Sequence, residues 1–335
     1  MPKSNKKITL QDIAEAADVS VALVSYVLNN RHPNRIKKTT SQKIKTIAKE
    51  LNYRPNHFAK GLKTQKSNTI GLILADIGVP FSAQLARIIE QEAQREGYVV
   101  LMGSTEENEN KLSQLLDAFL KQQVDGLLVM PTAEAKEELK ILHQSRTPYV
   151  LIDRYFPTEP FNFVICDNHF GTYTATKALL EKGKSKIGFI TIETELFHFL
   201  DRKNGFIEAY KEVNLPIENL IKEIKLYPLR KNVFHALDEL RTQHSDLDAV
   251  LFTTDVLTMY GLQYAIKHQL NVPNEIEIVG FDEAEFYDIF PNPITYYKQP
   301  IEAMVKKSMQ FLLGQMKQKD EKQIQEIIQG ELIYR

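Results

Sequence analysis

Apolar residues recur at intervals of three and four along the first part of the chain, a spacing that predicts short amphipathic helices. Thr9 and Asp12 stand three apart and can cap a first helix that ends before Asp18. Ser20 can accept from the first amides of a second helix that runs to residue 29. The two helices are separated by a turn of a few residues. Their apolar faces are expected to share one core, made by Leu10, Ile13, Ala14, Ala17, Val19, Val24, Val27 and Leu28.

A third amphipathic segment is expected to close this core, with its cap near residues 39–41. Two closely spaced helices, the second with a polar outer face, form a helix-turn-helix that can enter a major groove. Short helix pairs also occur as plain structural hairpins, so the pattern alone leaves both interpretations open. The third segment should turn four residues inward, namely Ile44, Ile47, Ala48 and Leu51.

A very short helix is predicted after Pro55. This proline disfavours helical geometry at the residue before it, and Asn56 can cap a helix over residues 57–63. So short a segment is not stable alone in water, where roughly 12 to 15 residues are already marginal. We expect a twin segment or a nucleic-acid minor groove to order it through Phe58 and Leu62.

Beyond residue 68, short apolar runs alternate with amphipathic segments, a pattern typical of parallel sheets with helices on both faces. The runs are too numerous for one domain of average size, so two α/β lobes are expected. A strand at 294–297, a helix from Pro300 and a terminal strand near 327–333 should return to the first lobe, which makes three crossings between the lobes. The preceding strand candidates are 70–75, 98–102, 126–130, 149–153, 163–166, 187–192, 224–227, 249–253 and 276–281.

Charge divides the chain at the same place. The chain has 335 residues and a net charge of -1, yet residues 1–66 hold fourteen Lys and Arg against four Asp and Glu. The remainder holds 28 basic and 39 acidic residues. A basic head on an acidic body is expected when one end binds a polyanion and the rest must stay off it. A Lys-rich head that is merely soluble is the alternative.

Several classes of protein are disfavoured by what the sequence lacks. Cys166 is the only cysteine and cannot form an internal disulfide, and no secretory signal is visible, so a cytoplasmic location is expected. The longest apolar run, 69–75, is far short of the roughly 18 to 20 residues of a membrane helix. No phosphate-binding glycine loop, metal-ligand spacing or nucleophile elbow occurs. We therefore expect no enzyme activity, no cofactor and no metal.

Binding remains, and paired α/β lobes hold ligands in the crevice at the carboxyl ends of their strands. Carboxylates and a guanidinium there can hold the vicinal hydroxyls of a sugar or sugar acid. With no Trp present, Phe81, Tyr227 and Phe281 could stack on a sugar face, although such aromatic residues are more often core. Strand-end Asp residues can also be mere helix caps, as Asp255 could be. The polar strand-end residues are Asp76, Ser104, Asp153, Arg154, Asp167, Arg202, Asp255 and Asp282.

The chain resembles the LacI/GalR family of bacterial transcription regulators. In the head the similar motifs lie at 9–14, 18–20, 24–29 and 51–56, and in the body at 150–154, 166–171, 202–206 and 279–283. The resemblance implies a helix-turn-helix head over residues 1–55, a hinge helix and linker over 56–68, and a doubly wound periplasmic-binding-protein-like core over 69–335. It places the first lobe at about 69–163 plus 297–325 and the second at about 164–294.

The resemblance also implies DNA-binding residues. Val21, Ala22 and Tyr26 fall on base-reading positions, and Leu62 on the residue that enters the minor groove. Tyr26 stands where Arg is most common and offers one hydroxyl instead of a bidentate contact to guanine. Ser20 could be only a cap and Asn29 only a helix end. The further DNA-binding positions are Thr9, Ser20, Ser25, Asn29, Lys37, Thr40, Tyr53, Asn56, His57 and Ala59.

For the ligand, the resemblance implies contacts from Asp153, Arg202 and Asp282, with Cys166 where a pocket aromatic often stands and Asp255 in place of a usual Asn. The full expected set is Phe81, Ser104, Asp153, Cys166, Arg202, Tyr227, Asp255, Phe281 and Asp282.

The sequence thus predicts a homodimeric repressor that binds palindromic operator DNA under control of a sugar, sugar acid or sugar phosphate. Three alternatives stay open. The body could belong to a solute-binding protein that serves a transporter, or to a cytosolic sugar-processing enzyme that uses Asp153 or Asp282 as acid or base. A purine or a phosphoprotein could replace the sugar as effector.

Overall fold

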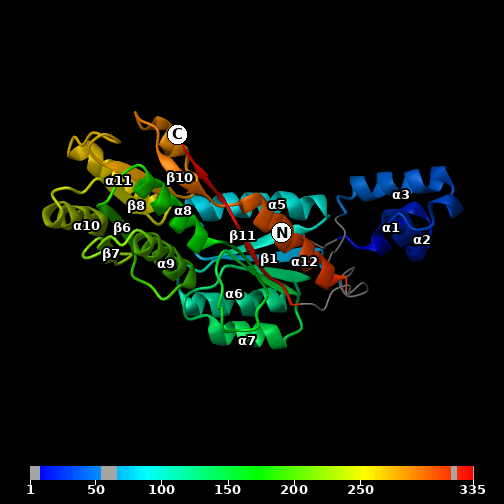
Figure 1. The fold of residues 1–335 in the computed structure, drawn as a ribbon. Helices are drawn as coiled ribbons and strands as arrows, with labels where there is room; N and C mark the ends of the chain where they lie inside the picture. Colours follow the sequence, from blue (N-terminus) through cyan, green and yellow to red (C-terminus); the bar gives the residue numbers. More distant parts are fainter. Residues whose placement is uncertain (1–7, 54–65, 318–322, 335) are drawn as a thin grey trace, which may run out of the picture. The chain divides into compact units, whose positions relative to one another are not determined.

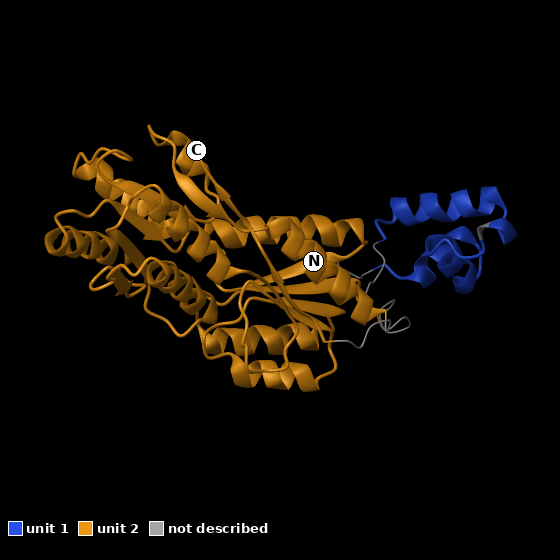
Figure 2. Ribbon diagram, viewed as in Figure 1, with its two compact units in different colours: residues 1–65 blue, residues 66–335 orange. Residues whose placement is uncertain are grey.

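The structure is a computed structural model that describes residues 8–53, 66–317 and 323–334 (Figure 1). The chain forms two compact units, Met1–Gln65 and Lys66–Arg335 (Figure 2). We call them the head and the body, and each is described by itself. No helix in the described ranges is both long and apolar enough to cross a membrane.

The helices of the head begin and end where local side chains satisfy their free amides. Thr9 and Asp12 form the expected capping box, and Ser20 caps the second helix by accepting from the Leu23 amide at 3.3 Å. Asp18 adopts a φ of 54°, a left-handed conformation that ends the first helix and starts the turn. The described elements are α1 (Leu10–Ala17), α2 (Val21–Leu28), the 3-10 helix η1 (Pro33–Arg35) and α3 (Lys38–Glu50).

The third helix starts earlier than expected, so the predicted cap near residues 39–41 is wrong. Its N-cap is Lys37, which makes no side-chain cap hydrogen bond. The hydroxyl residues lie inside the first helical turn, where the Ser41 amide donates to the Lys37 carbonyl at 3.0 Å. The three apolar faces meet as predicted in a core of Ile13, Ala14, Ala17, Val24, Val27, Ile44 and Ala48.

The body contains two six-stranded sheets, and each sheet with its helices forms one lobe. β12 runs antiparallel to β10, and the other described strand pairs are parallel, as predicted. The first sheet has the order β11-β5-β4-β3-β1-β2, with β1 (Thr69–Leu74), β2 (Val99–Ser104), β3 (Gly126–Val129), β4 (Tyr149–Ile152), β5 (Phe163–Cys166) and β11 (Gln325–Ile328). The second has the order β12-β10-β9-β8-β6-β7, with β6 (Ile187–Ile192), β7 (Ile221–Ile224), β8 (Ala249–Phe252), β9 (Glu277–Phe281), β10 (Thr295–Lys298) and β12 (Glu331–Ile333).

Helices cover both faces of each sheet, which confirms the doubly wound architecture (Figure 1). In the first lobe, α5 (Pro80–Arg95) and α12 (Ile301–Met316) pack on one face, and α6 (Glu109–Lys121) and α7 (Lys136–Gln144) on the other. In the second lobe, α10 (Leu229–Gln243) and α11 (Asp255–Lys267) cover one face, and α8 (Asn168–Glu181) and α9 (Phe197–Glu212) the other. A 3-10 helix, η2 (Glu285–Ile289), follows β9.

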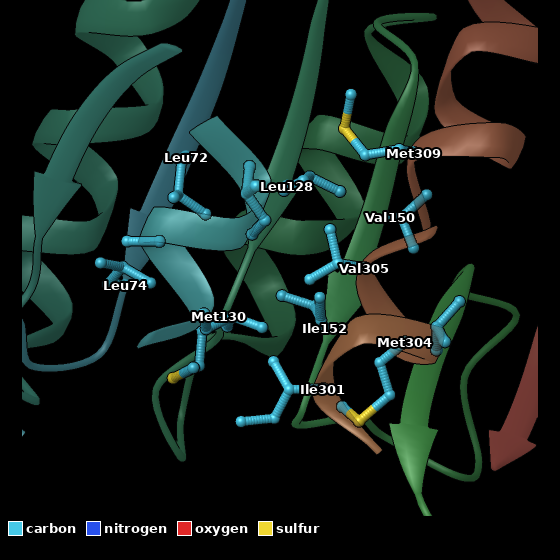
Figure 3. Packing of buried hydrophobic residues seen from close by; sticks show 14 of the residues in the cluster. Leu72, Leu74, Leu128, Met130, Val150, Ile152, Ile301, Met304, Val305 and Met309 are labelled. Atoms are coloured by element: carbon cyan, nitrogen blue, oxygen red, sulfur yellow. The ribbon is translucent and has the colours of Figure 1, made fainter. Parts of the chain in front are cut away.

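The strands read as continuous apolar runs because both of their faces are buried. Successive side chains alternate between the faces: Leu72 and Leu74 lie in the cluster beneath α12, whereas Ile73 lies in the opposite cluster. Figure 3 shows Ile301 and Val305 of α12 among the residues of the first cluster. This packing fixes the height of the strand ends, where polar side chains emerge.

The lobe boundaries differ from the prediction. β5 pairs with β4 and β11, so the chain leaves the first lobe after Cys166, not between residues 163 and 164. β10 pairs with β9, so residues 295–298 belong to the second lobe and do not return to the first. The seventh strand also lies earlier than 224–227, because Ile221 is in register with Phe189 of β6.

The predicted single terminal strand is two strands in different sheets. β11 lies in the first sheet and β12 in the second. Between them, Gly330 passes so close to β10 that a Cβ would lie 2.1 Å from the Lys298 carbonyl oxygen. The described chain therefore crosses between the lobes three times, after β5, after β10 and after β11, which agrees with the predicted number.

Candidate functional site

The second helix of the head presents an exposed surface beside its buried face. The side chains of Val21 and Tyr26 are each 42% exposed, and Ala22 is exposed. Asn29 donates from its amide to the Ser25 carbonyl at 2.8 Å, and Ser20 caps the helix, so the local structural roles weighed for both residues are confirmed. Their contact with DNA stays a prediction. The surface itself is formed as a helix-turn-helix requires.

Tyr26 is held by its neighbours. Its ring makes an edge-to-face contact with His32, with centroids 5.6 Å apart, and its carbonyl accepts from the Arg31 amide at 2.8 Å. His32 has a φ of 52°, which turns the chain back toward the helix. The side chain expected to read a base is therefore partly ordered before any DNA is present.

A groove of about 650 Å³ runs beside Tyr26 between α2 and α3. Four cationic side chains line it, and no carboxylate is among the described residues that do so. Such a groove suits an anionic backbone better than a neutral ligand. The cations are Arg31, Lys38, Lys45 and Lys49.

The remaining DNA-binding predictions divide into three groups. Lys37 is exposed and Thr40 is half-buried, both at the start of α3. Thr9 is engaged in its capping box, and Tyr53 packs against the head core. Four predicted residues, together with the predicted hinge helix, lie outside the described residues: Asn56, His57, Ala59 and Leu62.

In the body, a cleft of about 530 Å³ opens between the lobes at the carboxyl ends of the strands. This is the place that the fold predicts for a ligand, and the volume is typical of a small-molecule site. Six of the predicted ligand residues line it: Phe81, Asp153, Arg202, Tyr227, Asp255 and Asp282.

Three predicted ligand residues do not line the cleft. Ser104 is turned to the backbone, where its hydroxyl accepts from the Ile77 amide at 3.2 Å. Cys166 is buried in the core of the first lobe, and burial raises the pKa of its thiol. Phe281 is fully buried below Arg202, with its ring centroid 3.7 Å from the guanidinium carbon, so it supports a lining residue instead of forming the wall.

Arg202, on α9, is fixed by hydrogen bonds to the neighbouring helix α8 and to the residue after β8. Its Nε donates to Oδ1 of Asn168 at 2.8 Å, and its Nη1 donates to the Thr253 carbonyl at 2.5 Å. α8 and α9 approach closely because residue 205 is glycine: a Cβ there would lie 2.3 Å from the His169 carbonyl oxygen. The guanidinium is thus placed without a ligand.

Two of the cleft carboxylates sit on strained backbone. Asp153 follows β4 with a φ of 69°, and Asp282 follows β9 with a φ of 77°. Residues other than glycine rarely adopt this left-handed backbone region, and such conformations concentrate at binding sites. Asp282 also accepts from Nε2 of Gln299 at 2.6 Å. One strained Asp therefore faces the cleft from each lobe.

Asp255 is not the cap of the helix that it begins. The Thr254 hydroxyl accepts from the Leu257 amide at 3.1 Å and caps α11, so the capping interpretation of Asp255 is wrong. Its Oδ1 accepts from the Val256 amide at 2.7 Å. Asp167, by contrast, does cap α8 through the Phe170 amide at 2.9 Å.

Burial sets the protonation of these groups. It raises the pKa of Asp153 to about 6, although Arg154 and Arg202 favour the charged form. Burial, together with the charge of Asp282, raises the pKa of Asp255 to about 7. Burial raises the pKa of Asp282 as well, against the attraction of Arg202. Burial therefore outweighs the attraction of Arg202 at all three carboxylates.

Arg154, named above among the strand-end residues, lines the cleft, and so do three residues that the sequence analysis did not name: Glu107, His198 and Gln299. Arg154 forms a two-armed pair with Glu107, at 2.7 and 2.9 Å, although 47 positions separate them. His198 is buried in the cleft wall, and burial, with Arg154 and Arg202 nearby, lowers its pKa. Gln299 completes the set at the second crossing between lobes. Besides Arg154, only Gln299 followed closely on a predicted strand, whereas Glu107 and His198 had no such signal.

Comparison with known proteins identifies the family of the chain. Residues 9–56 match the family described as "Bacterial regulatory proteins, lacI family", and residues 176–335 match the "Periplasmic binding protein-like domain". Catabolite control protein A of Priestia megaterium is 31% identical over 296 residues, covering 88% of each chain. The chain belongs to the LacI family. Among its other relatives, DegA of Bacillus subtilis (strain 168), named an HTH-type transcriptional regulator, is 30% identical over 302 residues, covering 89% of this chain and 88% of DegA.

Solved structures show the same fold for this LacI-family chain. The lac repressor dimer bound to operator and the anti-inducer ONPF aligns with a TM-score of 0.86 at 21% identity, covering 98% of each chain. The transcriptional regulator CelR in complex with cellobiose aligns with a TM-score of 0.73 at 22% identity, covering 98% of this chain and 99% of that one. The curated relatives named above are regulators, not enzymes.

Proposed function

We propose that this LacI-family chain is a homodimeric transcriptional repressor, whose affinity for a palindromic operator is set by a sugar-like effector bound between the two lobes. The observation that carries the proposal is the cleft. It holds a preorganised guanidinium, Arg202, and buried carboxylates from both lobes, in the same chain as a capped helix-turn-helix. The cleft alone would also fit a solute-binding protein, and the head is what favours a regulator.

The head would bind DNA with α2 in the major groove. Val21, Ala22 and Tyr26 are exposed on that helix and can meet base edges, which specify sequence. The cationic groove beside Tyr26 can follow the phosphate backbone, which supplies affinity that falls with salt. Two heads in a dimer would match the two halves of a palindrome.

The body can pass a ligand signal to the end of the predicted linker, where the linker joins the body. The amides of Ser67 and Asn68, where the body begins, donate to the two carboxylate oxygens of Asp125 at 2.7 and 2.9 Å. Asp125 directly precedes β3 of the first lobe. An effector that changes the closure of the lobes would shift this anchor in both subunits, and so alter the spacing of the heads.

The cleft acids are proposed as binding groups and not as catalysts. Asp282 is held by Gln299 and Asp153 lies beside two guanidiniums, which suits the fixed orientation of a hydroxyl. The named relatives are regulators. We expect pure protein to leave aryl glycosides and candidate sugars unchanged, and measurable turnover would support a sugar-processing enzyme.

A truncation tests the proposal. Operator sequence is first obtained by selecting bound duplexes from random DNA. Removing residues 1–66 should abolish binding to that operator, while candidate effectors still raise the melting temperature of residues 67–335. A truncated body that still binds the operator would refute the role of the head.

A further inference from the structure

We propose that the cleft selects polyhydroxylated effectors that carry no anionic group, and rejects sugar phosphates and sugar acids. The inference rests on the proposed function and narrows its effector class. It is carried by three independent features of the lining: its charge, the engagement of its arginines, and the kind of polar atom that it leaves without a partner.

The lining is strongly acidic. Among the described residues of the cleft wall, six carry carboxylates and two carry guanidiniums, and no lysine lines the cleft. An anionic ligand would enter a negative field within walls of low dielectric, where charge repulsion is strongest. The acids are Asp76, Glu107, Asp153, Glu193, Asp255 and Asp282.

Arg154 is already committed. Its Nη1 and Nη2 donate to the two carboxylate oxygens of Glu107, and Nη1 also donates to the Pro131 carbonyl at 3.1 Å. A phosphate could capture this fork only by displacing Glu107, which would leave a carboxylate unpaired beside the new anion. Arg154 is therefore not an anion site.

Arg202 is also largely engaged. Nε binds Asn168, Nη1 binds the Thr253 carbonyl, and Phe281 covers one face of the guanidinium. A phosphate or carboxylate is recognised best by two parallel N–H groups. The engaged atoms leave too little of the fork for that geometry, but enough to donate to a hydroxyl oxygen.

Two buried oxygen atoms of the cleft can each accept a hydrogen bond that the protein does not supply. Oδ2 of Asp255 and Oε1 of Gln299 have no hydrogen-bond partner among the described residues, although the two residues are only 1% and 3% exposed. The amide of Gln299 is oriented by its bond to Asp282, which leaves Oε1 as the acceptor. A buried acceptor without a partner is unfavourable, so a ligand that donates a hydrogen bond there gains affinity.

Two further buried atoms, both nitrogens, can pair with the oxygen atom of a ligand hydroxyl. Nε of Arg154 and Nδ1 of His198 are buried without a hydrogen-bond partner, although Nε lies 3.8 Å from Oδ2 of Asp153. A hydroxyl both donates and accepts, whereas an ionised phosphate or carboxylate has little or nothing to donate. A chain of neighbouring hydroxyls therefore matches the mixture of acceptors and donors, and an anionic group does not.

The test compares neutral sugars with their anionic counterparts on the full-length protein. Glucose, galactose, ribose and cellobiose are measured by thermal shift and calorimetry against glucose 6-phosphate, glucuronate, galacturonate and ribose 5-phosphate. We expect at least one neutral compound to bind, and every anionic partner to bind at least 100-fold more weakly. An anionic member that binds more tightly than its neutral parent would overturn the inference, and so would the failure of all neutral members to bind.

A charge variant and its control locate the selectivity. At pH 8, above the pKa of about 7 of Asp255, the substitution Asp255→Asn removes one cleft charge with little change of shape, and should reduce the discrimination against the anionic partner by about tenfold. Asp246→Asn, exposed and outside the cleft, should leave it unchanged. Equal discrimination in the Asp255→Asn variant would contradict the electrostatic basis.

Operator binding is measured in parallel on the same preparations. An anionic effector that alters operator affinity would overturn the inference and leave the proposed function standing. Selective sugar binding by a chain that prefers no duplex over bulk competitor would do the reverse.

Discussion

Tyr155 donates its hydroxyl hydrogen to Oδ2 of Asp201 at 2.8 Å, and this bond joins the two lobes. Tyr155 follows β4 in the first lobe, and Asp201 lies on α9 of the second. Phe197, at the start of α9, packs against the apolar cluster of the first lobe, with its ring 5.9 Å from that of Tyr155. Arg202 is the next residue after Asp201, so the contact that holds the lobes together adjoins a ligand-binding residue.

Removing the Tyr155 hydroxyl should destabilise the arrangement in which this bond joins the two lobes. Tyr155→Phe keeps the ring contacts but deletes a hydrogen bond to a carboxylate, which contributes about 1.5–3 kcal/mol. If the effector binds the arrangement in which this bond joins the lobes, its loss reduces the fraction of molecules that can bind the effector. The effector concentration needed for half response then rises roughly 10-fold. Calorimetry with the effector, and small-angle scattering without it, measure the two effects.

Mutation of Asp201, the other partner in this hydrogen bond, provides the control. Asp201→Asn alters the same bond from the other lobe, so the double variant should be no worse than the more affected single one. Additive losses would show that the two residues act independently. Operator selection in the absence of effector should be unchanged in all three.

Arg202→Lys should separate ligand response from DNA binding. Lysine keeps a positive charge among the acids but cannot reproduce the bonds to Asn168 and Thr253 or the packing on Phe281. We expect effector affinity to fall at least 10-fold while the operator affinity of the ligand-free protein stays within about 2-fold. Electrophoretic mobility shifts with and without effector measure both. A normal effector response would remove Arg202 from the site.

Asp255→Asn should stabilise the ligand-free protein at neutral pH. Folding raises the pKa of this acid to about 7, through burial and the charge of Asp282 and against the attraction of Arg202. The native state thus binds the proton more tightly, and its stability falls as pH rises from about 4 to about 7. At pH 8 the variant should melt about 4 °C or more above the original chain.

The same difference should shrink as the pH is lowered to 5, where the original Asp255 is protonated. His198 acts in the opposite direction: its lowered pKa makes the native state lose stability as pH falls below about 6.5. It is present in both proteins and therefore does not affect the comparison. A difference that is constant between pH 5 and 8 would contradict the assigned cause.

His32→Ala should relax base preference without removing DNA binding. The edge-to-face contact restrains the Tyr26 ring, and such pairs are worth about 0.5–1.5 kcal/mol. We expect operator affinity to fall roughly 3- to 10-fold, with selectivity lost mainly at one base pair of each half-site. Selection of bound duplexes from random DNA measures this loss of selectivity. Tyr26→Phe, which keeps the ring, should alter the preferred base at the same position; an effect elsewhere would contradict the pairing.

Local structure in the head was readable from the sequence because its determinants lie within one helical turn. Thr9 needs only Asp12, and Ser20 needs only the amide of Leu23, so spacing alone identifies both caps. The exception follows the same reasoning. Thr39 to Ser41 have capping side chains, but the turn before them lets the helix begin at Lys38, so they lie in its first turn and the Ser41 amide donates to the Lys37 carbonyl.

The cleft was partly readable for a similar reason. Parallel strands deliver their carboxyl ends to one edge, so Asp153 and Asp282 could be placed there from sequence order alone. Phe281 and Cys166 were misplaced because adjacent strand residues face opposite sides, and the side that carries the ligand depends on the packing above it. Arg202 was expected at a strand end and was also implied by the family resemblance, but it lies inside α9.

Tertiary structure decided what depends on partners far along the chain. β11 belongs to the first lobe because it pairs with β5, more than 150 residues earlier. Glu107 engages Arg154 across 47 positions, and Tyr155 meets Asp201 across 46. Hydrophobic period and capping act over a few residues and leave a readable trace in the sequence. Pairing between distant segments leaves none, because closing the loop between them is compensated only when the whole lobe packs.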